Sequence, residues 1–74
     1  LRFTLPRTGH VSLKVYDAAG RLVRTLVDEV RPAAEHVATW DGRDDAGATV
    51  AAGVYLCQVQ TPGASDARRV VLVK

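Results

Sequence analysis

The stretch that decides the fold lies between residues 40 and 55: Trp40-Asp41-Gly42, then Asp44-Asp45-Ala46-Gly47, then Gly53-Val54-Tyr55. Aspartate and glycine suit tight turns, because aspartate caps backbone N–H groups and glycine adopts positive φ without strain. A large aromatic residue stands on each side of these turns, within a β-type run. The stretch therefore predicts a corner of a small β-sandwich, and it holds no constellation of reactive side chains.

Strands on either side of this corner are predicted from apolar residues at alternate positions. The clearest case is residues 10–16, where Val11, Leu13 and Val15 share one face of a half-buried strand. The same reasoning predicts strands over residues 1–5, 35–41, 54–60 and 68–74, and a very short strand starting at Val50.

The turns between these strands have recognisable residue patterns. Asp-x-x-Gly occurs at residues 17–20 and again at residues 44–47, and aspartate at the first position with glycine at the fourth indicates a type I turn. Pro62-Gly63 suits the two central positions of a type II turn.

Residues 21–30 leave two interpretations open. Their apolar residues fall at helical spacing, yet the run follows a tight turn directly and contains β-branched residues, as the return strand of a hairpin does. As a strand, it is apolar on both faces or carries a β-bulge between Val23 and Leu26. We expect a strand.

The pattern as a whole is that of an all-β sandwich. We expect about seven short, mostly antiparallel strands, because turn signals recur about every 8–12 residues. A chain of 74 residues makes one domain, over residues 1–74. Leu13, Val15, Trp40 and Tyr55 are expected to hold its core. The chain lacks methionine even at position 1, so we expect a piece of a longer protein or a processed product.

Charge and hydropathy exclude several classes of partner. A net charge of +2 is too small to indicate nucleic acid or an anionic membrane. No run approaches the roughly 20 apolar residues of a membrane span, so we expect no membrane insertion. The single cysteine, Cys57, excludes an internal disulfide, and its apolar neighbours predict a buried thiol.

The search for catalytic or metal-binding residues gives little. Asp41, Asp44 and Asp45 are candidates for a weak Ca²⁺ site, but the EF-hand pattern fails, because its third position is Arg43 and its twelfth is Ala52. Turn capping explains these carboxylates better. The residues His10, His36 and Cys57 are scattered singly, so neither a zinc site nor a nucleophile with its base is predicted. We expect no enzyme activity and no cofactor.

Two features could serve a binding partner. Trp40 and Tyr55 could form a sugar-stacking platform, although burial in the core is the simpler interpretation. The last strand is apolar on both faces over residues 70–73. The candidate interaction residues on this strand are Val70, Val71, Leu72, Val73 and Lys74. A small domain has one core, so one of these faces is either covered by loops or left for a protein partner. An edge strand can also accept an added strand.

The order of these motifs resembles a known family. Phe3-x-Leu5-Pro6 comes first, followed by Val11-x-Leu13-x-Val15-Tyr16-Asp17-x-x-Gly20-Arg21-x-Val23-x-x-Leu26, the 40–55 stretch, and a valine-rich end. This set resembles the immunoglobulin-like domain of the flagellar hook-capping protein FlgD. It is also similar to the type A C-terminal sorting domains of the bacterial type IX secretion system. The resemblance implies an immunoglobulin-like fold over nearly the whole chain.

The resemblance also implies a function. It indicates a non-catalytic C-terminal module of a secreted or cell-surface bacterial protein, acting in sorting or docking through residues 70–74. The expected partners are proteins: an upstream domain of the same chain, secretion machinery or neighbouring copies. Sorting domains often shorten the loop after Trp40, whereas this chain keeps the longer hook-capping form. Two alternatives therefore stay open: a structural assembly domain, and an accessory carbohydrate- or calcium-binding module of an exoenzyme.

Overall fold

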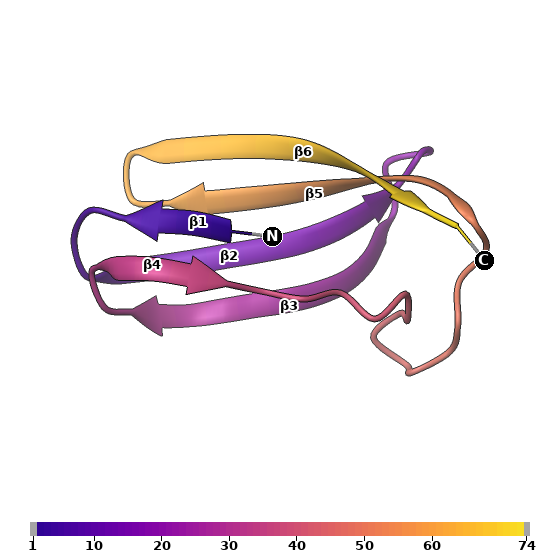
Figure 1. The fold of residues 1–74 in the computed structure, drawn as a ribbon, viewed down its shortest axis with the longest axis horizontal. Coiled ribbons are helices and arrows are strands. Elements are labelled where there is room, and N and C mark those ends of the chain that lie inside the picture. Colours follow the sequence, from indigo (N-terminus) through magenta and orange to yellow (C-terminus); the bar gives the residue numbers. More distant parts are fainter. Residues whose placement is uncertain (1, 74) are drawn as a thin grey trace.

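The computed structural model describes residues 2–73 and contains six β-strands in two antiparallel sheets (Figure 1). The strands are β1 (Arg2–Leu5), β2 (Gly9–Asp17), β3 (Leu22–Arg31), β4 (Ala34–Val37), β5 (Gly53–Thr61) and β6 (Ala64–Leu72). The expected all-β, immunoglobulin-like architecture is confirmed, with six strands in the described residues where about seven were expected. No helix in residues 2–73 is long and apolar enough to cross a membrane.

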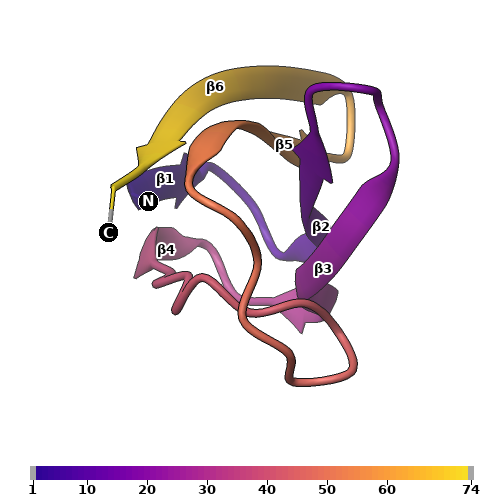
Figure 2. The same ribbon diagram turned by 90° about the vertical axis from the view of Figure 1, so that its right-hand side faces the viewer.

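The two sheets differ in width. β1 pairs only with β4, whereas the larger sheet has the order β3-β2-β5-β6. Figure 2 shows the four-stranded sheet curving around the two-stranded one, with the loop between β4 and β5 closing one end. The narrow sheet lies over part of the wide one, so the inner face of β6 is incompletely covered.

The segment of ambiguous periodicity is a strand, as expected. β3 pairs with β2 from end to end, but the register shifts twice. Leu13 pairs with Val27 and Lys14 with Thr25, so Leu26 is the extra residue of the first bulge; the second shift passes over Val23. Both extra residues pack against the core. The bulges change the phase of the strand, which explains why its apolar residues imitate helical spacing.

The two Asp-x-x-Gly turns form the same set of hydrogen bonds. In each, the glycine N–H donates to the carbonyl of the aspartate at 3.0 Å. Oδ1 of Asp17 accepts from the N–H groups two and four residues ahead, and Oδ1 of Asp44 does the same. Gly20 and Gly47 have φ values of +85° and +86°. The predicted turns are confirmed, and Gly63, at φ +80°, fits the type II turn between β5 and β6.

Three of the predicted strands are absent or differ from expectation by more than one residue at an end. β4 ends at Val37, which pairs with Arg2; the described residues offer no partner strand beyond that pair, so the predicted continuation to residue 41 is irregular. No strand starts at Val50, although Arg43 and Thr49 form an isolated bridge. β6 begins at Ala64 and not at residue 68, because the tight turn places Ala64 directly opposite Thr61.

The core lies between the sheets. Its buried apolar members are Leu5, Val11, Leu13, Val15, Val27, Tyr55 and Cys57. They come from the inner faces of β1, β2, β3 and β5. By contrast, residues 64–69 of β6 are all exposed, and only Val70 and Leu72 of that strand pack against the core.

Candidate functional site

The loop between β4 and β5 is held at both ends by aromatic side chains. Trp40 and Tyr55 pack edge to face, with ring centroids 5.0 Å apart. The indole N–H of Trp40 donates to the carbonyl of Arg43 at 2.9 Å, and the hydroxyl of Tyr55 donates to the carbonyl of Ala51 at 2.6 Å. Tyr55 is buried and Trp40 half-buried beside the core. Both side chains therefore hold the loop in place, and the buried ring of Tyr55 is not accessible for stacking on a sugar.

The three aspartates proposed as a weak Ca²⁺ site serve separate positions. The carboxylate of Asp41 accepts a hydrogen bond from the backbone N–H of Arg43 and lies 3.7 Å from a guanidinium nitrogen of Arg24. Asp44 caps its own turn. Asp45 accepts from the N–H of Thr25, and its own N–H donates to Val23. Within residues 2–73 no group of acidic, histidine or cysteine side chains is arranged to hold a metal ion.

These contacts have a structural consequence that the sequence did not suggest. Asp45 occupies the hydrogen-bonding edge of β3 over Val23 and Thr25, where another strand could otherwise add. Exposed strand edges invite pairing with other chains. The loop therefore covers part of one lateral edge of the four-stranded sheet.

The scattered candidates for nucleophilic or zinc chemistry are not brought together. Cys57 is fully buried in the core, and burial raises the pKa of its thiol. His10 lies 2.7 Å from a carboxylate oxygen of Asp28 on the outside of the sheet. His36 stacks on Phe3 in the other sheet, with ring centroids 5.4 Å apart. A thiol without a neighbouring base is not an activated nucleophile.

The C-terminal strand has one face inside and one outside. β6 pairs with β5 and forms a lateral edge of its sheet. Val70 and Leu72 pack against the core, whereas Val71 and Val73 are 56% and 80% exposed. Lys74, the last of the predicted interaction residues, lies outside the described residues.

Val71 belongs to a larger apolar surface, which we call the outer patch. Its members are Tyr16, Leu22, Val54, Leu56 and Val71. Tyr16 pairs with Leu22 on one side and Leu56 on the other, and Val54 pairs with Val71. All are exposed except Tyr16, which is half-buried. The outer patch therefore crosses all four strands at one end of the wide sheet, a contiguity that scattered surface valines lack.

The comparison with protein families agrees with this geometry. A family model, the FlgD Ig-like domain, matches residues 1–65. The chain belongs to the FlgD Ig-like domain family. Comparisons with curated proteins and with solved structures gave no match. A small FlgD Ig-like domain is typically a non-catalytic module.

The family match locates what this FlgD Ig-like domain shares with its relatives. It spans the aromatic-held loop, both Asp-x-x-Gly turns and the Pro62-Gly63 turn, and it ends at Ser65 near the start of β6. Most of β6, including Val71, lies beyond the match. The match therefore covers most of the scaffold of the domain but leaves out most of the last strand.

Charge surrounds the outer patch unevenly. Every side-chain carboxylate in residues 2–73 either accepts a hydrogen bond or forms an ion pair. Lys14 and Arg69 lie on the outer face of the sheet, since Arg69 pairs with Leu56 and Lys14 with Gln58. Neither forms an ion pair within the described residues. The patch of this FlgD Ig-like domain is therefore bordered by uncompensated positive charge.

Proposed function

We propose that this FlgD Ig-like domain is a docking module of a bacterial protein that acts outside the cytoplasm, and that it sorts or anchors that protein through its last strand. The observation that carries the proposal is the outer patch together with the adjoining edge of β6. An exposed apolar surface of this kind stabilises a protein contact by its burial, and a free edge strand supplies unpaired backbone groups beside it.

The chemistry of the surface supports a protein partner. Val71, on the outer face of β6, and Val73, just beyond the strand, are both exposed, so a partner can bury them without unfolding the domain. Lys14 and Arg69 border the patch and carry uncompensated charge. A protein surface that combines apolar residues with carboxylates is complementary to it. A component of secretion machinery of the type IX kind is the partner that we propose.

Deletion of the last strand is a poor test, because Val70 and Leu72 pack against the core and their loss would unfold the domain. The better perturbation is the double variant Val71→Lys and Val73→Lys, which changes only exposed side chains. Val30→Lys is the matched control: Val30 is 64% exposed and lies on β3 opposite His10, outside the patch.

The experiment measures surface display of the parent protein in a bacterium with a type IX system, and thermal unfolding of each isolated variant. We expect the double variant to fold like the native domain while its surface display falls at least tenfold. The control variant should be displayed normally. Unchanged display of the folded double variant would refute the proposal.

A structural assembly role is the second candidate, favoured by the same exposed patch, which a neighbouring copy could cover. Sedimentation analysis of the isolated domain separates the two. Concentration-dependent association that Val71→Lys abolishes would favour assembly, whereas a monomer at all concentrations would favour docking to a different protein.

A further inference from the structure

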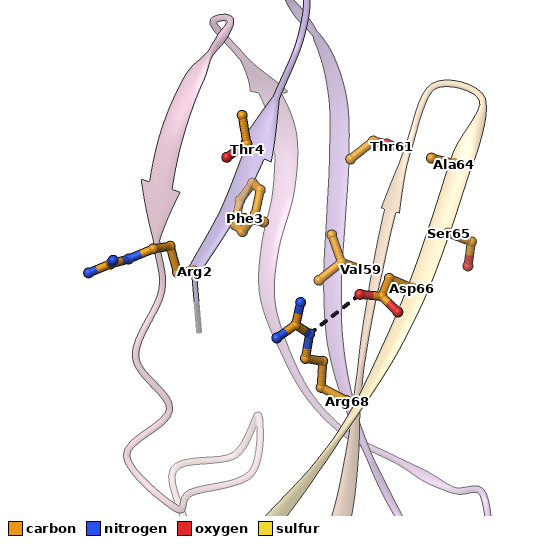
Figure 3. Close-up of a pocket in the computed structure, with 9 residues that line it drawn as sticks. All are labelled: Arg2, Phe3, Thr4, Val59, Thr61, Ala64, Ser65, Asp66 and Arg68. Atoms are coloured by element: carbon orange, nitrogen blue, oxygen red, sulfur yellow. Dashed lines mark hydrogen bonds and ion pairs between the residues drawn. The ribbon is translucent and has the colours of Figure 1, made fainter.

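The other side of the sandwich carries a groove that the docking surface does not use. It is a cavity of about 530 Å³ between β1 and the inner faces of β5 and β6. Phe3 and Val59 form its apolar floor, and Asp66 and Arg68 stand on its β6 wall. Figure 3 shows Phe3 and Val59 pointing toward each other, with the Asp66–Arg68 ion pair beside them.

The groove exists because the two sheets differ in width. Val11, Leu13 and Cys57, on β2 and β5, are fully buried. The inner face of β6 has no such cover: Asp66 pairs with Val59 and Arg68 with Cys57, so both point inward, yet both are exposed. A third strand beside β1 would lie over this uncovered face.

The edge of β1 that faces the groove is free. β1 pairs with β4 on one side and with no strand in residues 2–73 on the other. A free strand edge presents unpaired N–H and C=O groups in register for an added strand. Since the six strands of the described chain are already placed, the occupant must come from another polypeptide or from residues outside this sequence.

The size of the groove fits a short strand. A strand residue within a sandwich fills about 160 Å³, from a spacing of about 4.8 Å, a sheet separation of about 10 Å and a rise of about 3.3 Å. The cavity of about 530 Å³ thus accepts about three residues, close to the 4 residues of β1.

We propose that this groove accepts an extended peptide strand of another protein, which pairs with the free edge of β1 and closes the smaller sheet. Alternate small β-branched side chains of that strand lie on Phe3 and Val59. A carboxylate at its end meets Arg68. The guanidinium of Arg68 is largely exposed, and its one ion pair within residues 2–73 is a long one, 3.4 Å from Asp66.

The test uses a defined peptide and the isolated domain. The probe is an acetylated and amidated hexapeptide, glutamate-threonine-valine-threonine-valine-glutamate. Nuclear magnetic resonance of the ¹⁵N-labelled domain should show saturable shifts at the amides of residues 3–5 and at Val59. A second peptide with its central threonine replaced by proline lacks one N–H donor and should bind at least tenfold more weakly.

The chain offers matched variants on one strand. Ala64 lines the groove, whereas Ala67 pairs with Gln58 on the outer face of β6, and both are exposed. Ala64→Glu places a carboxylate in the groove and should weaken binding of the acidic peptide at least tenfold. Ala67→Glu should leave it unchanged.

Several results would overturn the proposal. It fails if the peptide produces no saturable shifts, if the two glutamate variants bind it equally, or if the shifts fall on β6 alone. Protection of the β1 amides from hydrogen exchange in the full-length parent protein would show that its own chain fills the groove, and self-association through β1 would show that a second copy does. None of these results bears on the Val71 and Val73 display experiment, so the two proposals fail separately.

Discussion

Tyr55→Phe tests whether the loop between β4 and β5 is held as the structure indicates. The substitution removes only the hydroxyl that donates to the carbonyl of Ala51 at 2.6 Å. The ring keeps its buried position and its edge-to-face contact with Trp40. The variant thus isolates one hydrogen bond from the packing around it.

The expected cost follows from the burial of the two partners. A hydrogen bond between neutral groups contributes about 0.5–1.5 kcal/mol net. The Ala51 residue is exposed, so water can replace the lost donor, and we expect a loss near the middle of that range, about 1 kcal/mol. For a domain of this size, that corresponds to a fall in Tm of about 4–8 °C.

The assay is thermal and urea unfolding followed by the fluorescence of Trp40, the only tryptophan, whose ring contacts Tyr55. The matched control is Tyr16→Phe, because Tyr16 lies half-buried on the outer face and its hydroxyl has no hydrogen-bond partner in residues 2–73. That control should unfold within about 0.5 kcal/mol of the native domain. Equal stability of the two variants would show that the Tyr55 hydroxyl does not fasten the loop.

Three other perturbations address the turns and the core. Gly9→Ala should destabilise the domain by about 1–3 kcal/mol, because the added Cβ would lie 2.6 Å from Cγ of Pro62. In urea unfolding, the lost stability should be recovered when Pro62→Ala is added. A single variant as stable as the native domain would disprove the close approach. In the folded domain the pKa of the Asp17 carboxyl is lowered from 3.8, chiefly by the hydrogen bond from the backbone N–H of Arg21. The ionised carboxylate therefore stabilises the fold fully at pH values above the unfolded pKa of 3.8, and this stabilisation is lost as the pH falls through the lower pKa of the folded state. Nuclear magnetic resonance titration should find that lower pKa, and Asp17→Asn should remove this part of the acid dependence. Leu13→Ala should cost about 2–5 kcal/mol because Leu13 is fully buried, whereas Val30→Ala should change unfolding by less than about 0.5 kcal/mol; similar losses in both would contradict the placement of the core.

Local chemistry made most of the fold predictable. The turns at Asp17 and Asp44 follow from one aspartate side chain bonding two N–H groups, which needs no tertiary information. The alternation of Val11, Leu13 and Val15 likewise identified the inner face of β2. The two bulges in β3 defeated simple periodicity, because each adds one residue and exchanges the faces of all that follow.

What sequence reasoning missed depends on contacts between distant residues. Asp45 bonds to the edge of β3, 20 residues away, and no local pattern distinguishes that role from turn capping. The groove beside β1 arises from the unequal widths of two sheets, a property of topology. The two inward charges on β6, Asp66 and Arg68, were the available signal, since alternation alone would place apolar residues there.

The burial of the single cysteine, Cys57, makes the fold of this domain independent of redox conditions. The chain contains no second cysteine, so no step of its folding requires an oxidant. The side chain of Cys57 is buried on the inner face of the four-stranded sheet. Glutathione, oxidoreductases and the thiols of a fused partner therefore find nothing to react with in the native state. The same structure can therefore form under reducing conditions and persist under oxidising ones.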